Sequence, residues 1–447
     1  MSIKNLEPNG LWKNFYALTQ IPRPSKKEEK VVAFLKEFGE NLGLETIVDK
    51  VGNVIIRKPA TPGYEDRMGV VLQAHVDMVP QKNSDKVHDF EKDPIETRIE
   101  DGWVKANGTT LGADNGVGAA AAMAVLEATD LVHGPIEGLF TIDEETGMTG
   151  ANALEPGVLK GDILINMDSE TEGELYVGCA GGIDTCGYFT PTFEDVPENS
   201  KAFQLIVKGL KGGHSGMDII LGRANANKIM NTLLLILTEK YNARVADIQG
   251  GSLRNAIPRE SFVTITVPEA KAEELLAYVP EFEAVVKEQF AAVEPEMSIT
   301  VVPAEMPAKV IDKQTIANLI EAVAKYPNGV IAMSKDFEGT VETSSNLAIV
   351  KLVDGQIMTA SLQRSLVDAS KDELAAEMRK VLESCGARAE STGSYPGWKP
   401  NINSIIYNTM KKVYADKYGK TPKTMVIHAG LECGILGSKY PNWDMVS

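Results

Sequence analysis

Residues 69–79 read GVVLQAHVDMV, an apolar run that carries His75 and Asp77 near its end. A run of this kind predicts a buried strand. Side chains two residues apart in a strand point to the same face, so the imidazole and the carboxylate are expected side by side. This pair suits a metal ligand and its orienting carboxylate. A single H-x-D, however, is more often a core histidine whose ring is satisfied by an acid.

Further apolar runs flank this stretch, and helical patterns alternate with them. A helix is predicted over about 26–42, beginning with a capping box formed by Ser25 and Glu28. Strands that alternate with helices favour an α/β domain with a mostly parallel sheet covered by helices. The other predicted elements are the strands VGNVIIR (51–57), EGLFTID (137–143) and GDILINMD (161–168), and the alanine-rich helix VGAAAAMAVLEA (117–128).

The pattern changes near residue 187 to strands mixed with long amphipathic helices. It changes again after ESTGSYPGWKPN (390–401), a segment rich in Gly, Pro and Ser that is typical of a domain junction. We therefore predict a discontinuous α/β domain of residues 1–186 and 397–447, interrupted by an α+β domain over 187–396.

The composition excludes several functional classes. The chain has 447 residues and a formal net charge of −17, and no Lys/Arg block interleaves with aromatic residues, so a nucleic-acid partner is not expected. The start lacks the apolar core of a signal peptide, and the richest apolar stretch, TLLLIL (232–237), is too short to span a bilayer. The four cysteines have no C-x-x-C spacing, which excludes a zinc ribbon. The sequence indicates a cytoplasmic protein without membrane contact.

Acidic residues follow several of the predicted strands. Asp114 lies in the glycine-rich turn TTLGADNGVGAA (109–120), Glu144 and Glu145 in FTIDEETG (140–147), and Asp168 in ILINMDSE (163–170). Each alone could be a turn residue, a helix cap or a solvated strand end. The carboxyl ends of strands in an open α/β sheet meet at one crevice, where these acids would repel one another unless cations neutralised them. The set therefore predicts a metal site.

Taken in order, HxD, GADNG, DEETG and NMDSE resemble the motifs of the M20 metallopeptidases. The segments GGHSGMDI (212–219), SLRNAIPRE (252–260), ASLQRS (360–365) and IHAGLECG (427–434) are similar to the aminoacyl-histidine dipeptidase (peptidase D) branch of this family. The resemblance covers nearly the whole chain. It implies a catalytic domain of the zinc exopeptidase type with an α+β lid, and metal-dependent hydrolysis of unblocked dipeptides, X-His among them.

The resemblance also implies the metal ligands. His75 and Asp168 would bind one zinc, Glu145 the second, and Asp114 would bridge them, with the Asp114–Asn115 peptide in the cis form. Two zinc ions per subunit are expected, for which manganese or cobalt can substitute. Asp77 would orient His75.

Glu144 would be the general base that takes a proton from a water activated by the two zincs. Neighbours in an extended chain face opposite ways, so one of Glu144 and Glu145 can ligate while the other approaches the water. In the lid, the resemblance implies that His214 stabilises the oxyanion and that Asn255 and Arg364 hold the substrate. Arg364 would bind the C-terminal carboxylate of the dipeptide.

One ligand of the family pattern is missing from the sequence. The resemblance implies a further histidine for the second zinc downstream of GLECG, yet no histidine follows His428. The second site is thus expected to be incomplete, either because the chain is shortened at its C-terminus, which we favour, or because His428 takes the place. Otherwise His428 is interpreted as pocket lining.

Other functions remain open from the residues alone. Gly116 and Gly118 before a helix imitate a dinucleotide fingerprint, but no strand precedes them. Ser215 imitates a serine-hydrolase elbow that lacks its last glycine. Within the family, an aminoacylase or deacylase and a non-catalytic homologue are the alternatives, and a homodimer is one possible assembly.

Overall fold

The strands predicted in the first part of the chain form one sheet in the computed structural model of the protein, which describes residues 2–447. The strand order is β1-β2-β6-β3-β7-β23; β3 is parallel to β6 and β7, and β23 is parallel to β7. β2 runs antiparallel to both of its neighbours, β1 and β6. The prediction of a mostly parallel sheet is confirmed. The strands are β1 (Glu45–Val48), β2 (Val54–Lys58), β3 (Val70–His75), β6 (Ile136–Thr141), β7 (Ile163–Asn166) and β23 (Asp444–Val446).

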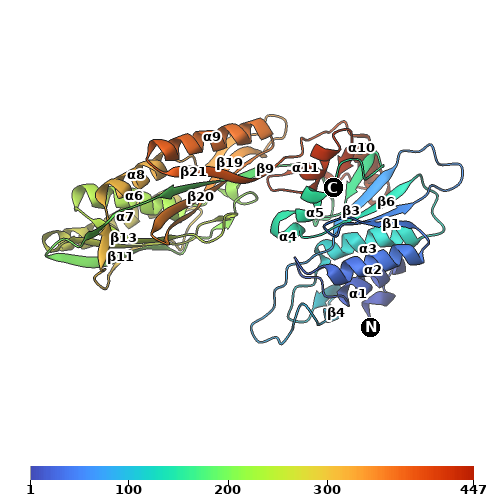
Figure 1. The fold of residues 1–447 in the computed structure, drawn as a ribbon, viewed down its shortest axis with the longest axis horizontal. Helices are drawn as coiled ribbons and strands as arrows, with labels where there is room; N and C mark the ends of the chain where they lie inside the picture. The colour runs from blue at the N-terminus through green and yellow to red at the C-terminus, as the bar shows by residue number, and fades with distance from the viewer. Residues whose placement is uncertain (1) are drawn as a thin grey trace. The chain divides into compact units, whose positions relative to one another are not determined.

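Helices α1 (Asn9–Thr19), α2 (Glu29–Asn41) and α3 (Ala113–Glu127) lie together on one side of this sheet (Figure 1). Their apolar side chains share a core with β2, β3 and β6, in which Phe15, Leu35, Met123 and Phe140 are fully buried. Burial of such side chains contributes about 1.5–3 kcal/mol each to the free energy of unfolding. This core fixes the strand ends that carry the predicted metal ligands.

The predicted capping box at the start of α2 is wrong. The helix begins at Glu29, and the Glu28 carboxylate accepts hydrogen bonds from the backbone N–H groups of Lys26 (2.8 Å) and Asp143 (3.1 Å). The Ser25 hydroxyl donates to Asp77 (2.8 Å) instead of capping the helix. Both polar groups serve tertiary contacts with the carboxyl edge of the sheet.

The chain forms two compact units, which we call the first unit (Met1–Gly178, Trp398–Val426 and Leu431–Ser447) and the second unit (Cys179–Gly397 and Ile427–Gly430). The first change of unit thus lies earlier than the predicted boundary after residue 186. The reason is that β9 (Gly181–Phe189) pairs with β20 (Gln356–Ser365), a strand of the second unit. Gly397 also belongs to the second unit, because its N–H donates to Asp368 (3.0 Å).

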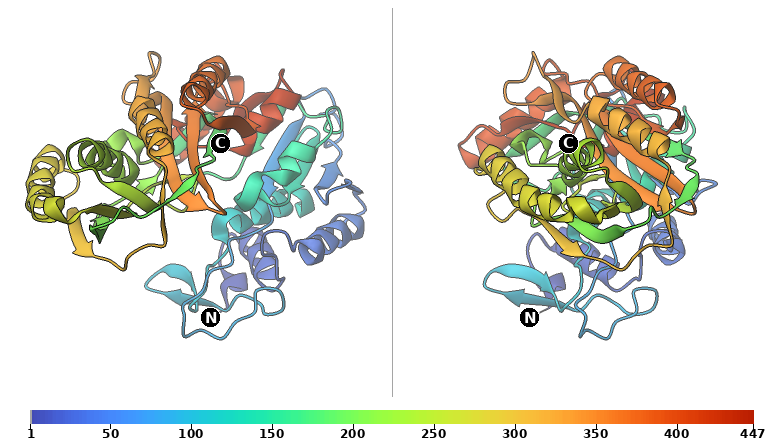
Figure 2. Two further views of the ribbon diagram at one scale, coloured as in Figure 1. Left: turned by 60° about the vertical axis from the view of Figure 1, so that its left-hand side comes forward. Right: turned by 90° about the vertical axis from the view of Figure 1, so that its left-hand side faces the viewer.

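The second unit contains an antiparallel sheet with the order β16-β11-β15-β13-β19-β20-β9-β21, and β18 pairs with β19. Helices α6, α7, α8 and α9 contribute to one core with these strands (Figure 2). Sequential strands and helices of this kind form an α+β unit, as predicted. The bounds are β11 (Ser200–Lys208), α6 (Ala226–Lys240), β13 (Arg244–Gly250), β15 (Ser261–Pro268), α7 (Glu269–Phe290), β16 (Ser298–Pro303), α8 (Lys313–Lys325), β18 (Gly329–Met333), β19 (Val341–Val353), α9 (Asp368–Ser384) and β21 (Arg388–Tyr395).

Shorter elements complete the chain. The 3-10 helices are η1 (Ile3–Asn5) and η2 (Ile219–Leu221), and the short or C-terminal helices are α4 (Glu144–Gly147), α5 (Thr149–Ala153), α10 (Ile405–Tyr418) and α11 (Glu432–Lys439). Paired outside the large sheets are β4 (Thr97–Glu100) with β5 (Trp103–Ala106), β8 (Glu174–Cys179) with β22 (Lys423–Ile427), β10 (Phe193–Asp195) with β17 (Lys309–Ile311), and β12 (Gly213–His214) with β14 (Ala256–Ile257). None of the helices within residues 2–447 is both long and apolar enough to cross a lipid bilayer.

Candidate active site

His75 is the last residue of β3, at the carboxyl edge of the parallel strands. It pairs in register with Thr141, the last residue of β6, and its ring is almost fully buried. The Nε2 atom lies 2.9 Å from Oδ1 of Asp114 and 3.4 Å from Oδ1 of Asp168. One ligand atom from each of the three side chains lies within 4.8 Å of the others. The structure therefore brings together three of the four predicted metal ligands at one point.

The Asp77 carboxylate holds this point together. Its Oδ1 accepts from Nδ1 of His75 (3.2 Å) and from the Glu144 backbone N–H (3.0 Å). Its Oδ2 accepts from the Ser25 hydroxyl (2.8 Å) and from the Glu145 backbone N–H (3.3 Å). A carboxylate at Nδ1 keeps one ring hydrogen there, so Nε2, which faces the two aspartates, is the nitrogen that a metal ion can bind once it displaces the proton on it. Without that proton, the ring is in the state of histidine that binds a metal.

Asp77 itself is fully buried but stays ionised. Burial raises its pKa, and the hydrogen bond and the charge of His75, together with the donors from Glu144 and Ser25, outweigh burial and lower it. A buried carboxylate with several donors is stable as an anion. Asp77 can therefore act as a fixed negative partner of the imidazole.

Glu144 and Glu145 do not end a strand, so the predicted reason for their separate roles is wrong. The chain turns at Asp143, whose φ is 48°, and both glutamates lie in the first turn of the short helix α4. Burial, followed by Glu432 and Asp168 nearby, raises the pKa of Glu144 to about 9, while the charge of His75 opposes the rise. Burial and Asp114 raise the pKa of Glu145 to about 7. A nearby cation would lower both pKa values and make both groups anionic near neutral pH.

The pKa values of the other three predicted ligands are shifted as well. Burial lowers the pKa of His75, but its hydrogen bonds to Asp114, Asp168 and Asp77 outweigh this and raise it well above the usual value. Burial raises the pKa of Asp168, and the hydrogen bond to His75 lowers that of Asp114. Protons and a metal ion thus compete for this group of side chains.

Asp114 enters the site from the start of α3, where its backbone is not helical (ψ 113°). The Asp114–Asn115 peptide is cis, which confirms that prediction. A cavity of about 590 Å³ adjoins the site and is lined by Asp114, Met167, Asp168 and Glu170, among others. The Asp114 side chain is therefore accessible within the first unit, with 46% of its surface exposed, whereas the His75 side chain is 1% exposed.

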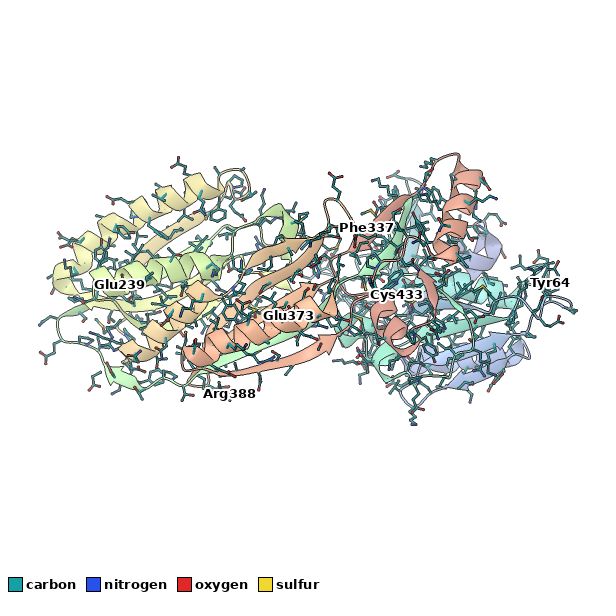
Figure 3. The ribbon with its side chains drawn as sticks, turned by 90° about the horizontal axis from the view of Figure 1, so that it is seen from above. Tyr64, Glu239, Phe337, Glu373, Arg388 and Cys433 are labelled. Carbon is teal, nitrogen blue, oxygen red and sulfur yellow. The ribbon has the colours of Figure 1, made fainter. Side chains whose placement is uncertain are left out.

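Sequence reasoning missed the buried polar groups behind the site. Oε2 of Glu432, on α11, accepts from Gln73 (2.6 Å) and Thr141 (2.8 Å), and burial raises the pKa of Glu432 to about 7. Figure 3 marks α11 by the neighbouring Cys433. Arg23 is buried as well. The one available signal for Glu432 was its place inside the GLECG motif, and Arg23 has no acidic neighbour in the sequence.

In the second unit, His214 is the last residue of β12. This strand pairs with β14, which begins at the residue after Asn255. The His214 Nδ1 accepts from the backbone N–H groups of Gly216 (3.2 Å) and Met217 (3.0 Å), so the ring hydrogen is on Nε2. Burial and the charge of Arg364 lower the pKa of His214 to about 4. The ring is therefore a neutral hydrogen-bond donor at pH 7.

Arg364 lies on β20 with only 4% of its surface exposed. It donates to the Tyr395 hydroxyl (2.8 Å) and contacts the Ser215 hydroxyl (3.5 Å), while the Ser215 N–H donates to the Asn255 carbonyl (2.8 Å). These bonds gather the predicted substrate-binding residues of the second unit into one group with a buried positive charge.

His428 also belongs to the second unit. Its Nε2 lies 2.7 Å from the Ser344 hydroxyl, and burial, with Arg364 nearby, lowers its pKa to about 3. Metal ligation through Nε2 would require the bond to Ser344 to break. This geometry favours the interpretation of His428 as a lining residue.

Comparison with known proteins identifies the family. The model of peptidase family M20/M25/M40 matches residues 71–446. The chain belongs to this family. It is 44% identical over 445 residues to the cytosol non-specific dipeptidase of Escherichia coli (strain K12), covering 100% of this chain and 92% of that protein. The crystal structure of aminoacylhistidine dipeptidase from Vibrio alginolyticus superposes with a TM-score of 0.88 at 46% identity, covering 100% of this chain and 91% of that chain.

A more distant structure of an M20-like fold, an aminopeptidase from Bacillus cereus, matches with a TM-score of 0.53 at 17% identity over 99% of this chain and 90% of that chain. The predicted family and fold class are thus confirmed, and the protein is a peptide hydrolase. M20 peptidases bind divalent metals, and the group of His75, Asp114 and Asp168 fits such an ion, because a buried imidazole nitrogen and carboxylate oxygens are the ligands of zinc and similar metals.

Proposed function

We propose that this M20 peptidase hydrolyses unblocked dipeptides, X-His among them, with His75, Asp114, Glu145 and Asp168 as ligands of two zinc ions. The observation that carries the proposal is the buried group of His75, Asp114 and Asp168 beside Glu144. It is supported by two relatives named as dipeptidases, each matched along the whole of this chain.

His75 and Asp168 would hold one ion, Glu145 the other, and Asp114 would bridge them; manganese or cobalt can replace zinc. When bound, the ions supply a water of lowered pKa and positive charge for the developing oxyanion. The donors proposed for the second ion are Glu145 and Asp114, and we therefore propose that this ion is the more weakly held of the two.

Glu144 would act as the general base. Its carboxyl group has a pKa of about 9 without a cation, and positive charge nearby lowers this value toward neutrality. An anionic Glu144 can then take the proton of the attacking water and return it to the leaving amine. Asp77 would hold the Glu144 backbone and the His75 ring in one geometry, because its Oδ1 accepts from both.

The second unit would supply substrate recognition. The neutral His214 ring presents an Nε2–H that can donate to the oxyanion. Arg364 would bind the C-terminal carboxylate of the dipeptide through its planar guanidinium, and Asn255 would donate to the substrate backbone. The buried Arg364 guanidinium donates to the hydroxyl groups of Ser215 and Tyr395 and forms no ion pair with a carboxylate within residues 2–447, so it is suited to a carboxylate ligand.

The proposal extends to location and assembly. We propose a cytoplasmic location, in line with the name of the Escherichia coli relative. We also propose a homodimer formed through the apolar side chains of η2 and β18, which are exposed in the second unit: Ile220, Leu221, Val330 and Ile331. Sedimentation velocity on the wild type and on Ile331→Glu tests the assembly, and a wild-type monomer would refute it.

The decisive experiment is an assay of the metal-loaded protein on a set of free dipeptides, on their N-acetylated forms and on N-acetyl amino acids. Free dipeptides should be hydrolysed, and chelation should abolish the activity until zinc, manganese or cobalt is restored. Activity restricted to N-acyl amino acids would replace the proposal with a deacylase. No hydrolysis of any of these compounds would indicate a non-catalytic homologue.

A further inference from the structure

Arg23 is one of the largest fully buried side chains of the protein, with 1% of its surface exposed. It follows α1 in the segment IPRPS. Its Nη1 donates to the backbone carbonyls of Val76 (2.9 Å) and Asp77 (3.0 Å), and its Nη2 donates to the carbonyl of Gly112 (2.5 Å). One guanidinium thus connects the loop after β3 to the loop before α3.

Two glycines of the LGADNG segment make room for this guanidinium. A Cβ atom at Gly112 or at Gly116 would lie 2.6 Å from Nη2 of Arg23, closer than a carbon can approach. Gly112 also has a φ of 68°, which favours glycine by itself, but Gly116 has an ordinary φ. The glycine at 116 is therefore explained by the space that Arg23 and the neighbouring Phe15 ring occupy.

The guanidinium is also a permanent positive charge among acids. Burial lowers the pKa of Arg23 to about 10, and the charges of Asp77, Asp114 and Glu145 oppose that fall. Arg23 hence stays protonated at neutral pH. Its charge lies near Asp114 and Glu145 without occupying their carboxylate oxygens, since its guanidinium donates to the backbone carbonyls of the two loops.

We propose that Arg23 is a positioning residue of the metal centre, which ties the Asp77 loop to the Asp114 loop and so sets the distance between His75 and the bridging carboxylate. This inference rests on the proposed metal site. The planar fork matters because two nitrogens reach carbonyls on two loops at once, which a single ammonium group cannot do with the same geometry. Charge alone would not suffice.

The test compares Arg23→Lys with Arg57→Lys. Arg57 is a matched control because it is also largely buried in the first unit, pairs with Glu137 and donates to a carbonyl, but it lies at the other end of the strands. Zinc affinity is measured by competition with a chromogenic chelator, and kcat and KM are measured on a dipeptide. Arg23→Lys should bind zinc about 10–100-fold more weakly, with KM within about twofold, because partners of metal ligands typically have effects of this size.

Two further variants separate positioning from folding. Arg23→Ala should regain zinc affinity when guanidinium chloride is added, and sodium chloride should have no such effect. Gly116→Ala keeps Arg23 but intrudes on it, and should weaken zinc binding, whereas Gly10→Ala, whose Cβ would meet Ala124 at 3.4 Å, should not. These glycine variants decide the matter if the arginine variants do not fold.

Unchanged zinc affinity in Arg23→Lys and in Gly116→Ala would overturn the inference. An equal loss in Arg57→Lys would overturn it too, because the effect would then come from general destabilisation. If the wild type binds no divalent metal, the proposed function fails instead, and the two failures are thereby distinguished.

Discussion

Replacing Asp77 by asparagine tests how the site is held, because the substitution keeps the shape and removes one accepting oxygen. The carboxylate accepts four hydrogen bonds, two on each oxygen, from His75, Ser25 and the backbones of Glu144 and Glu145. If the amide oxygen faces His75 and Glu144, the amide NH₂ faces the Glu145 N–H, which is left without an acceptor. A buried donor without an acceptor costs about 1–3 kcal/mol.

In the opposite orientation, the amide NH₂ faces Nδ1 of His75. Nδ1 must then accept, so the ring hydrogen moves to Nε2, the nitrogen that faces Asp114 and Asp168. That tautomer cannot bind a metal through Nε2. Either orientation therefore weakens metal binding, and we expect a loss of about 10–100-fold, as is usual for the partner of a ligating histidine. This loss corresponds to about 1.4–2.8 kcal/mol.

The assay is zinc affinity by chelator competition, together with thermal unfolding of the metal-free protein. Asp312→Asn is the matched control, because Asp312, which precedes α8 in the second unit, accepts the backbone N–H groups of Thr315 in that helix and of Thr192. Both variants should unfold at a lower temperature, but only Asp77→Asn should lose zinc affinity. Wild-type zinc affinity in Asp77→Asn would refute the argument that Asp77 fixes the tautomer of His75.

Three further predictions concern the chemistry. Glu144→Ala should lower kcat by about 10²–10⁴-fold at nearly unchanged metal content, and a variant that keeps a tenth of the wild-type rate would exclude Glu144 as the base. Because the pKa of Glu144 is raised to about 9 before a cation binds, zinc binding at pH 7 should release a proton from it, and this release should vanish as the pH rises above about 9. Calorimetry in buffers of different ionisation enthalpy measures it, and Glu144→Gln should release about one proton fewer. Arg364→Lys should raise KM for dipeptides, and C-terminally amidated dipeptides should be poor substrates of the wild type; equal kcat/KM on free and amidated forms would contradict carboxylate recognition.

The sequence predicted the strand that ends at His75 and the other central strands of the sheet. An apolar run indicates a buried strand from its own residues, whichever segments pack against it. It also placed Asp114 and Asp168 at the edge to which His75 belongs. It failed at Glu28, whose spacing from Ser25 matches a capping box. In the structure the Glu28 carboxylate accepts the Asp143 N–H, and the Ser25 hydroxyl donates to Asp77. Tertiary contacts decide which of several hydrogen-bond partners a polar side chain has, and the spacing of residues in the sequence does not reveal these contacts.

The sequence by itself determined the family, the mostly parallel sheet and the identity of the residues at its carboxyl edge, since motifs and apolar periodicity are local properties of the chain. Only the tertiary structure decided which groups hold those residues. Arg23 and Gly112 are far apart in the sequence and in contact in the fold. The same is true of Glu432 with Gln73 and Thr141. The physical reason is that a buried polar group must find its hydrogen-bond partner wherever packing brings one, and packing joins segments without regard to their separation along the chain.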